Sequence, residues 1–360
     1  MGRRPPRRRL KLRAWLGALL LAVAGCAPVA LPSGSLAGRL NDALRQNQQQ
    51  AFLDSFTADE AGSAAGRAWF VVLSRSEATF RQSDGQTLGV TATLAGDRRP
   101  ATWTLHLELD AATGRIRAVA PLPDRPIWAL GTVEATAASH GTVLTSGLDA
   151  ATRQRWAVRL DRAAAAVAAT APAGDAGWQG GLVVEVPANP ADFQAITGEL
   201  ANTASALTTC STGTPRIVVN PLILELSEEW LDSTLVHEAV HVATDSACVP
   251  VGRSLAWAVE GLAESVTARS DPATASRNRG LALAYVRDHP VPRALPAELE
   301  DLTSYALAQL AVDQVRARLG ARADDLLDRA VHDSSTVTTA EQDRVTGWYT
   351  AELTRLAKSG

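Results

Sequence analysis

The sequence has few cysteines, few aromatic residues and almost no lysine. Three cysteines occur in 360 residues, without the close spacing of the thiolate pairs in zinc sites. Aromatic residues make up 5%, which leaves no obvious aromatic pocket for substrate specificity. Lysine occurs only as Lys11 and Lys358, and this bias toward alanine and arginine indicates a high-GC genome rather than a function. No internal repeat is evident.

The sequence also lacks an apolar run long enough to span a bilayer comfortably. The run at residues 14–25 follows an arginine-dense head, so we expect residues 1–25 to be a secretion signal, with an uncleaved N-terminal helix as the alternative. "VAGC", residues 23–26, resembles the bacterial lipobox. The resemblance implies that Cys26 is acylated and anchors the protein to the extracytoplasmic side of the cell membrane. "RRRLKL" does not decide between Sec and twin-arginine export.

Removal of residues 1–25 removes seven basic side chains and no acidic ones, which changes the net charge from −3 to −10. This balance excludes a polyanion such as nucleic acid as a natural partner. Cys210 and Cys248 then remain as an even pair in a compartment where thiols oxidise. We expect one disulfide between them.

The chain predicts an α+β fold. After a tether at residues 26–35, helical spacing of leucine and alanine predicts a helix over 36–54. Alternation in "TWTLHLELD", residues 102–110, predicts a half-buried strand, and we expect further strands at 69–76, 89–96 and 115–121. A helix on an antiparallel sheet over residues 36–125 is similar to the cone-like folds of the nuclear-transport-factor type.

Three prolines in "PLPDRPIW", residues 121–128, predict a junction, after which residues 126–360 form a second domain. A hairpin pattern, a long alanine-rich helix and the apolar segment "GGLVVEVPAN" alternate there, which predicts a small mixed sheet with helices on it. "RIVVNP", residues 216–221, predicts another strand. The rest of the domain is expected to be mostly helical.

"LVHEAVHVAT", residues 235–244, carries the chemistry. His237 and His241 stand four positions apart in a helix that Ser227 and Glu228 are placed to begin, so both imidazoles share a face and can bind Zn²⁺. Glu238 is then placed beside the water at the open metal position. The alternative is a chance occurrence of HExxH in an unrelated helix.

A catalytic zinc needs a third protein ligand, and "LAWAVEGLAESV", residues 255–266, offers Glu260 with eighteen residues between it and His241. HExxH, this gap and the pattern W-x-x-EG-x-A resemble the gluzincin metallopeptidases, most closely the peptidase MA-like proteins of bacterial cell surfaces. The resemblance covers residues 130–335. It implies that His237, His241 and Glu260 bind zinc and that Glu238 is the general base.

Two further residues are candidates for the site. Glu264 follows Glu260 by one turn and is placed to accept the second ring N–H of a ligand histidine, although a solvated role is the alternative. The resemblance implies an oxyanion-binding tyrosine on a later helix, and Tyr305 stands fifteen residues before Gly320 in such a segment. Its alternative is a core aromatic, and Tyr285, His289 and His332 are competitors.

The chain lacks the "GAMEN"-like segment of aminopeptidases, so the resemblance does not extend to aminopeptidase activity. "RIVVNP" stands where gluzincins have the edge strand that binds an extended peptide. Asn220 in that segment either touches substrate or forms a turn before Pro221. A bridge between Cys210 and Cys248 would tie the loop between the ligand helices to the segment before this strand.

These features predict a lipid-anchored zinc peptidase that acts on a peptide or protein substrate, with Glu238 activating the attacking water. The alternative is a surface binding lipoprotein whose first domain recognises a ligand and whose zinc site is structural or vestigial. An intact base and an open coordination position favour the peptidase.

Overall fold

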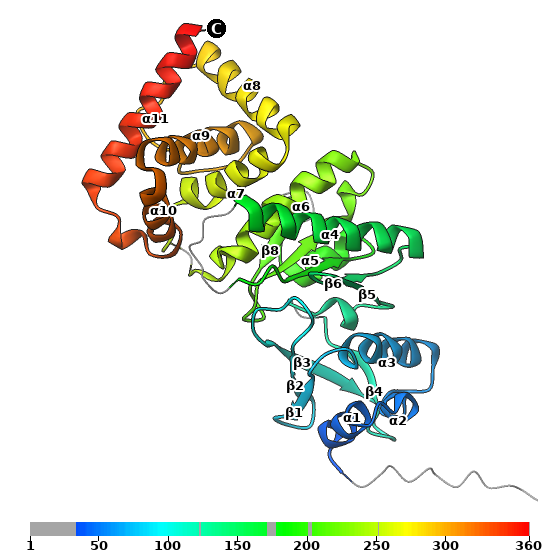
Figure 1. The fold of residues 1–360 in the computed structure, drawn as a ribbon. Coiled ribbons are helices and arrows are strands. Elements are labelled where there is room, and N and C mark those ends of the chain that lie inside the picture. The colour runs from blue at the N-terminus through cyan, green and yellow to red at the C-terminus, as the bar shows by residue number, and fades with distance from the viewer. Residues whose placement is uncertain (1–33, 122–123, 171–177, 201–203, 251, 360) are drawn as a thin grey trace, which may run out of the picture. The chain divides into compact units, whose positions relative to one another are not determined.

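The computed structural model describes residues 34–121, 124–170, 178–200, 204–250 and 252–359 (Figure 1). The predicted secretion signal, Cys26 and most of the tether lie outside the described residues. Residues Gly34–Gly360 group into one compact unit. Within the described ranges, no helix combines the length and the apolar character needed to cross a membrane.

The N-terminal part begins with helices α1 (Leu36–Arg45), α2 (Gln49–Leu53) and α3 (Glu60–Leu73). The prediction of a single helix over residues 36–54 is wrong, because the helix is interrupted at Asn47, whose φ of 51° is left-handed. The strand predicted at 69–76 is also wrong, since its first half ends α3. A short apolar run does not distinguish a strand from a buried helix.

A four-stranded antiparallel sheet follows in chain order, formed by β1 (Thr79–Gln82), β2 (Thr87–Ala92), β3 (Ala101–Leu109) and β4 (Ile116–Val119). The predicted alternation in β3 is confirmed, because Trp103, Leu105 and Leu107 are buried while the residues between them are exposed. Trp128, in a 3₁₀ turn at Ile127–Ala129, packs edge-on against Trp69 and Trp103. Trp128, at the end of the predicted junction, therefore belongs to the hydrophobic core of the N-terminal part.

The second sheet is mixed and has the strand order β5-β6-β7-β9-β8. Strands β6, β7 and β9 are parallel, whereas β5 and β8 lie antiparallel at the two edges. The edge position predicted for residues 216–221 is wrong, because β9 lies between β7 and β8. The strands are β5 (Glu134–Ala138), β6 (Gly141–Thr145), β7 (Leu182–Val186), β8 (Ala206–Thr209) and β9 (Arg216–Val219).

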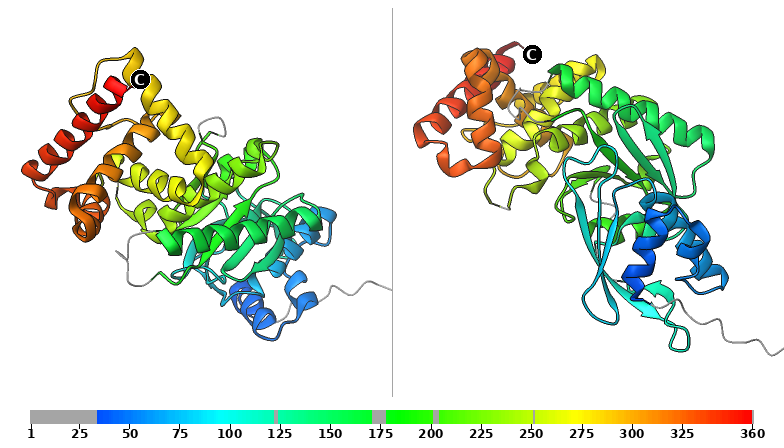
Figure 2. Two further views of the ribbon diagram at one scale, coloured as in Figure 1. Left: turned by 45° about the horizontal axis from the view of Figure 1, so that its top comes forward. Right: turned by 60° about the horizontal axis from the view of Figure 1, so that its bottom comes forward.

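Both faces of the mixed sheet are buried. Side chains such as Val143, Val184 and Ile217 pack in one core with helices α4 (Ala150–Thr170) and α6 (Glu228–Ala243) (Figure 2). On the opposite face, Leu144, Val183 and Val218 pack in the core of the N-terminal part, together with α5 (Pro190–Thr197). The two sheets therefore share a core, although the boundary predicted near residue 125 lies between them.

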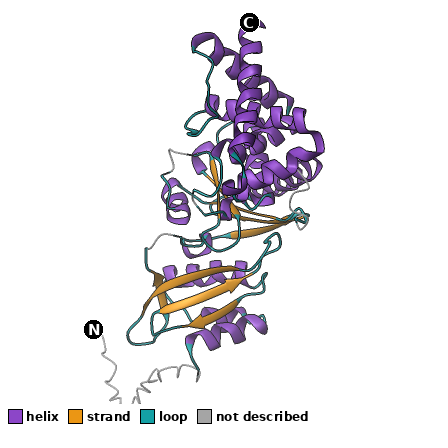
Figure 3. Ribbon diagram, turned by 90° about the vertical axis from the view of Figure 1, so that its left-hand side faces the viewer, coloured by secondary structure: helices purple, strands orange, loops and turns teal. Residues whose placement is uncertain are grey.

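The C-terminal half is helical, as predicted, and Figure 3 shows it beyond the strands of the two sheets. The α+β fold class is therefore confirmed. Its helices are α7 (Ala256–Ser270), α8 (Pro272–Asp288), α9 (Leu302–Leu319), α10 (Ala323–His332) and α11 (Thr339–Ser359), and further 3₁₀ turns occur at Pro221–Ile223, Ser246–Cys248, Gly320–Arg322 and Ser334–Thr336.

Candidate metal centre

Helix α6 positions both candidate histidine ligands. The hydroxyl of Ser227 accepts a hydrogen bond from the backbone N–H of Trp230 and so begins the helix where the sequence predicted. His237 and His241 lie one turn apart on one face, with ring centroids 5.0 Å from each other. The predicted helix across HExxH is therefore confirmed.

Glu260 of α7 completes a compact set of three potential ligands, the group in the described part of the chain that could bind a metal ion. Its Oε2 lies 3.1 Å from Nε2 of His237 and 3.4 Å from Nε2 of His241. The two histidine nitrogens are 3.2 Å apart. The three atoms therefore form a nearly equilateral triangle.

The triangle fits a tetrahedral metal. Zinc binds nitrogen and oxygen at about 2.0–2.2 Å, which separates two ligands of a tetrahedron by about 3.3 Å. The three measured separations of 3.1, 3.2 and 3.4 Å agree with this value. Three ligands of this type also leave a fourth position open, as in catalytic rather than structural zinc sites.

Hydrogen bonds at the other ring nitrogens determine which atoms face the centre of the triangle. Nδ1 of His237 lies 3.0 Å from Oε1 of Glu264, and a carboxylate can only accept, so this nitrogen carries a proton. Nδ1 of His241 lies 3.0 Å from the hydroxyl of Ser246. When the Ser246 hydroxyl accepts from Nδ1 of His241, two nitrogen lone pairs and a carboxylate converge, an arrangement that a cation stabilises.

The pKa values describe the same charge balance without a metal. Burial disfavours the charged form of His237, but hydrogen bonds and charges from Glu260 and Glu264 outweigh it and raise its pKa well above 6.5. Burial likewise opposes ionisation of Glu260 and Glu264. The neighbouring histidines outweigh burial and lower the pKa of both carboxyl groups. A cation at this position therefore replaces a proton that the cluster otherwise binds.

Glu238, the candidate base, is buried beside the edge strand β8. The Thr208 hydroxyl lies 2.7 Å from its Oε2 and 3.1 Å from its backbone oxygen. After burial and Glu260, the charge of Glu238 also contributes to the raised pKa of Tyr305. The Thr208 hydroxyl therefore orients one carboxylate oxygen of Glu238.

Tyr305 lies beside His237, with ring centroids 5.9 Å apart. Burial first, and then the carboxylates of Glu260, Glu238 and Glu264, raise the pKa of its phenol, which therefore stays protonated and can donate a hydrogen bond. Its helix α9 packs closely on α7.

The close packing of α7 and α9 depends on Gly261, the glycine of the W-x-x-EG-x-A pattern. A Cβ atom built on Gly261 would lie 2.4 Å from the backbone oxygen of Ala308. Because α9 packs so closely on α7, Tyr305 in its first turn reaches His237, one of the candidate metal ligands. The glycine of the motif thus has a packing role.

Glu264 lies at the end of a buried chain of hydrogen bonds. Its Oε2 accepts from Nδ2 of Asn278, 2.6 Å away, and the same nitrogen lies 2.8 Å from Oε1 of Gln309. Gln309 in turn donates to Asp313, whose pKa is raised by burial. Helices α8 and α9 therefore both orient the carboxylate that faces His237.

The competing candidates lie elsewhere. Tyr285 and His289 stack on each other, and Nε2 of His332 lies 2.6 Å from the backbone oxygen of Thr244 at the end of α6. Asn220 caps the 3₁₀ turn that follows β9, since its side chain accepts from the backbone N–H of Leu222 and donates to Ala204. These contacts agree with the alternative in which Asn220 forms a turn before Pro221.

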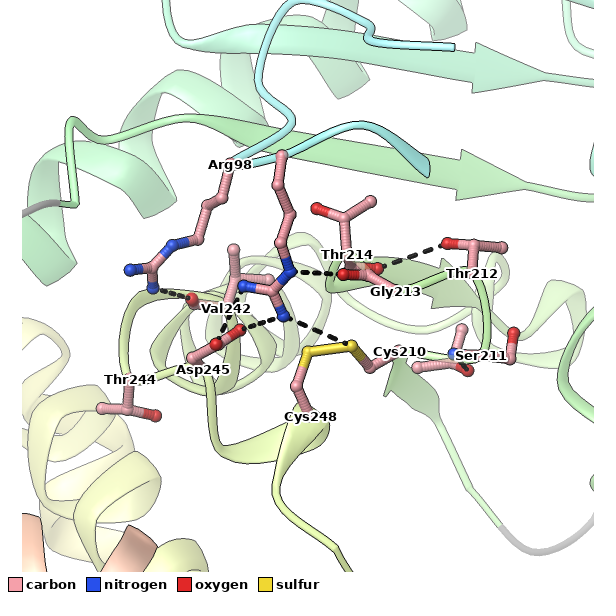
Figure 4. The surroundings of a disulfide bond; sticks show 12 residues. Arg98, Cys210, Ser211, Thr212, Gly213, Thr214, Val242, Thr244, Asp245 and Cys248 are labelled. Carbon is pink, nitrogen blue, oxygen red and sulfur yellow. Dashed lines mark hydrogen bonds and ion pairs between the residues drawn. A yellow bond between two sulfur atoms is a disulfide. The ribbon is translucent and has the colours of Figure 1, made fainter. Parts of the chain in front are cut away.

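The predicted disulfide between Cys210 and Cys248 is present. It connects the end of β8 to the 3₁₀ turn after α6, and Figure 4 shows Asp245 near it. The bridge therefore joins the edge strand to the loop between the two ligand helices.

Thr208, Ser246 and Asn278 were not predicted as site residues from the sequence. Each contacts a candidate site residue from a different helix, strand or turn, and a small polar side chain gives no local signal of such a contact. Only Ser246, five residues after His241, lies near the motif.

No protein-family model, curated protein or solved structure matches this chain. Its resemblance to gluzincins therefore remains a prediction from the motif residues.

Proposed function

We propose that the protein is a zinc-dependent peptidase. The observation that carries this proposal is the convergence of His237, His241 and Glu260 on one point, beside a buried carboxylate and a protonated phenol. Two histidines and a glutamate are a known ligand set of catalytic zinc. The zinc would polarise the scissile carbonyl as a Lewis acid and lower the pKa of water to about 7.

Glu238 supplies the base. Its carboxylate accepts a proton from the attacking water and delivers it to the leaving amine. Because Thr208 binds Oε2, the carboxylate keeps one orientation through both proton transfers.

Tyr305 supplies a second donor for the oxygen on which negative charge develops. The three carboxylates around it disfavour the phenolate, so the O–H group persists at neutral pH. An O–H donor next to a developing oxyanion stabilises the transition state more than the ground state.

Strand β8 supports a substrate position. It pairs with β9 on one side, and no described strand pairs with its other side. An extended peptide can add to such an edge by backbone hydrogen bonds. Thr208 connects β8 directly to Glu238, so a peptide along this edge would pass the proposed base.

The membrane location belongs to the same proposal. The secretion signal and the lipobox-like "VAGC" support a lipid anchor on Cys26 and activity at the outer face of the cell membrane. The substrate would then be a peptide or protein in the cell envelope.

Metal content and cleavage of a quenched-fluorescent peptide library test the proposal together. The wild-type chain should bind about one zinc and cleave peptides, whereas Glu238→Gln should keep the zinc and lose turnover. Glu229→Gln, an exposed glutamate on the same helix, is the matched control and should cleave like wild type. Absence of zinc from metal-replete wild-type protein would refute the proposal.

A second candidate function, ligand binding by the first sheet, has one observation in its favour. A hollow of about 840 Å³ lies on the polar face of that sheet and is lined by residues that include His106, Glu108 and Arg117. Chelation distinguishes the two functions. If the zinc were structural, its removal would unfold the protein, whereas a catalytic zinc should leave the fold intact.

A further inference from the structure

His241 depends on a residue outside the two ligand helices. Its Nδ1 lies 3.0 Å from the hydroxyl of Ser246, and both side chains are buried. A ligand histidine donates its second ring N–H to such a partner, and this hydrogen bond orients the ring. Whatever positions Ser246 therefore positions His241.

Ser246 lies in a constrained turn. The chain leaves α6 through Asp245, whose φ of 57° is left-handed and unfavourable for a residue with a side chain, and then enters the 3₁₀ turn Ser246–Cys248. Such a conformation persists only where the surroundings enforce it. Cys248 enforces it on one side through its disulfide with Cys210.

Arg99 enforces the turn on the other side. Its guanidinium forms two hydrogen bonds with the carboxylate of Asp245, at 3.0 and 3.2 Å. It also donates to the backbone oxygen of Gly213 and lies 3.7 Å from Sγ of Cys210. A planar guanidinium fixes the geometry of a carboxylate more strictly than a lysine ammonium does.

The segment around Arg99 is itself anchored to the mixed sheet. Asp97 forms a bidentate pair with Arg216, at 3.0 and 2.6 Å, and both side chains are fully buried. Arg98 donates to the backbone oxygens of Val242 and Ala243, at the C-terminal end of α6, where a cation is favourable. Figure 4 shows Arg98 reaching this end of the helix.

Gly96 shows how closely this segment packs. A Cβ atom on it would lie 2.2 Å from the backbone oxygen of Leu182 in β7, and its φ of 106° also disfavours a side chain. The segment between β2 and β3 therefore has little freedom to shift. It provides a fixed base for Arg99.

We propose that Arg99 is a positioning residue of the metal site, acting through Asp245 and Ser246 on the imidazole of His241. The loop between β2 and β3 would then contribute to metal affinity through these two residues. This inference rests on the proposed function, because it requires that His241 binds a metal.

The experiment compares zinc affinities of the full chain by competition with a chromophoric chelator. Ser246→Ala should weaken binding by about 10- to 100-fold, and Arg99→Ala by a smaller factor of about 3 to 10, because it acts through Ser246. When Arg99→Ala is combined with Ser246→Ala, zinc affinity should fall almost no further than in Ser246→Ala alone, since both changes remove the same constraint. Arg99→Lys should restore part of the loss. The absorption spectrum of the cobalt-substituted protein should change in Arg99→Ala.

Arg329→Ala is the matched control. It removes an ion pair with Glu341, 2.8 Å long, that joins α10 to α11. Its zinc affinity and cobalt spectrum should equal those of wild type, even if its stability falls. An equal loss in this control would show a general effect of destabilisation and overturn the inference.

Two further results would overturn it. Wild-type zinc affinity in Arg99→Ala would show that the pair between Arg99 and Asp245 has no effect on metal binding. If Arg99→Ala lowered zinc affinity by its full factor in the Ser246→Ala background as well, Arg99 would act on the site without Ser246. Absence of zinc from the wild-type chain would instead refute the proposed function, and the inference with it. If Arg99→Ala fails to fold, Asp245→Asn removes the same pair and tolerates the left-handed turn.

Discussion

Replacement of Glu264 by glutamine should weaken metal binding without changing any ligand. Glu264 accepts two N–H groups, one from His237 at Oε1 and one from Asn278 at Oε2. Glutamine has only one acceptor oxygen, so its own NH₂ must face one of these two donors. The charge that favours the proton on Nδ1 of His237 is lost as well.

The magnitude follows from this double loss. Removal of a hydrogen-bond partner of a metal-binding histidine costs about 10- to 100-fold in metal affinity. This range corresponds to about 1.4–2.7 kcal/mol of binding free energy. Because Glu264 is buried and its second oxygen is also bound, we expect the upper part of the range.

Zinc dissociation constants from chelator competition would measure the effect, with Glu229→Gln as an exposed control on α6. The variant should still bind one zinc at saturating metal, since all three ligands remain. An unchanged dissociation constant for Glu264→Gln would refute the claim that this carboxylate orients His237.

Three further outcomes are expected. Tyr305→Phe should lower kcat by about 100-fold or more at unchanged zinc content, as expected for an oxyanion donor, and an unchanged kcat would assign the ring to packing alone. Gly261→Ala should separate α7 from α9 and destabilise the protein by about 1–3 kcal/mol in urea unfolding, and a stability equal to wild type would contradict the close approach at Ala308. The metal-free protein should lose stability as pH rises above 6.5, because the pKa of His237 is raised in the folded state. It should also lose stability as pH falls below 4.5, because the pKa of Glu264 is lowered in the folded state. Added zinc should abolish the alkaline loss, and a urea midpoint that increases from pH 6.5 to 9 without metal would refute this charge balance.

Periodic sequence patterns predicted the parts of the site that depend on local structure. The four-residue spacing of His237 and His241 and the cap at Ser227 determine one helix, and both are explicit in the sequence. The gap to Glu260 was informative only because it resembles a family pattern. The convergence of these three atoms required the structure.

The errors have physical causes. The edge position of residues 216–221 was implied by the gluzincin resemblance, but β9 lies inside the sheet with all four of its residues buried, and a local pattern does not tell which strands pair with it. The break at Asn47 depends on one left-handed residue that the helical spacing hides. Contacts such as Thr208 to Glu238 join segments thirty residues apart, and single side chains carry no signal of them.

The burial of both faces of the mixed sheet limits how this protein can be divided. A fragment that starts at residue 126 would expose Leu144, Val183 and Val218 to water, and a fragment that ends there would lose the matching half of its own interior. Limited proteolysis between the sheets should therefore yield aggregates rather than two soluble pieces. In evolution, the N-terminal sheet and the half that contains the candidate metal centre are constrained to be inherited together.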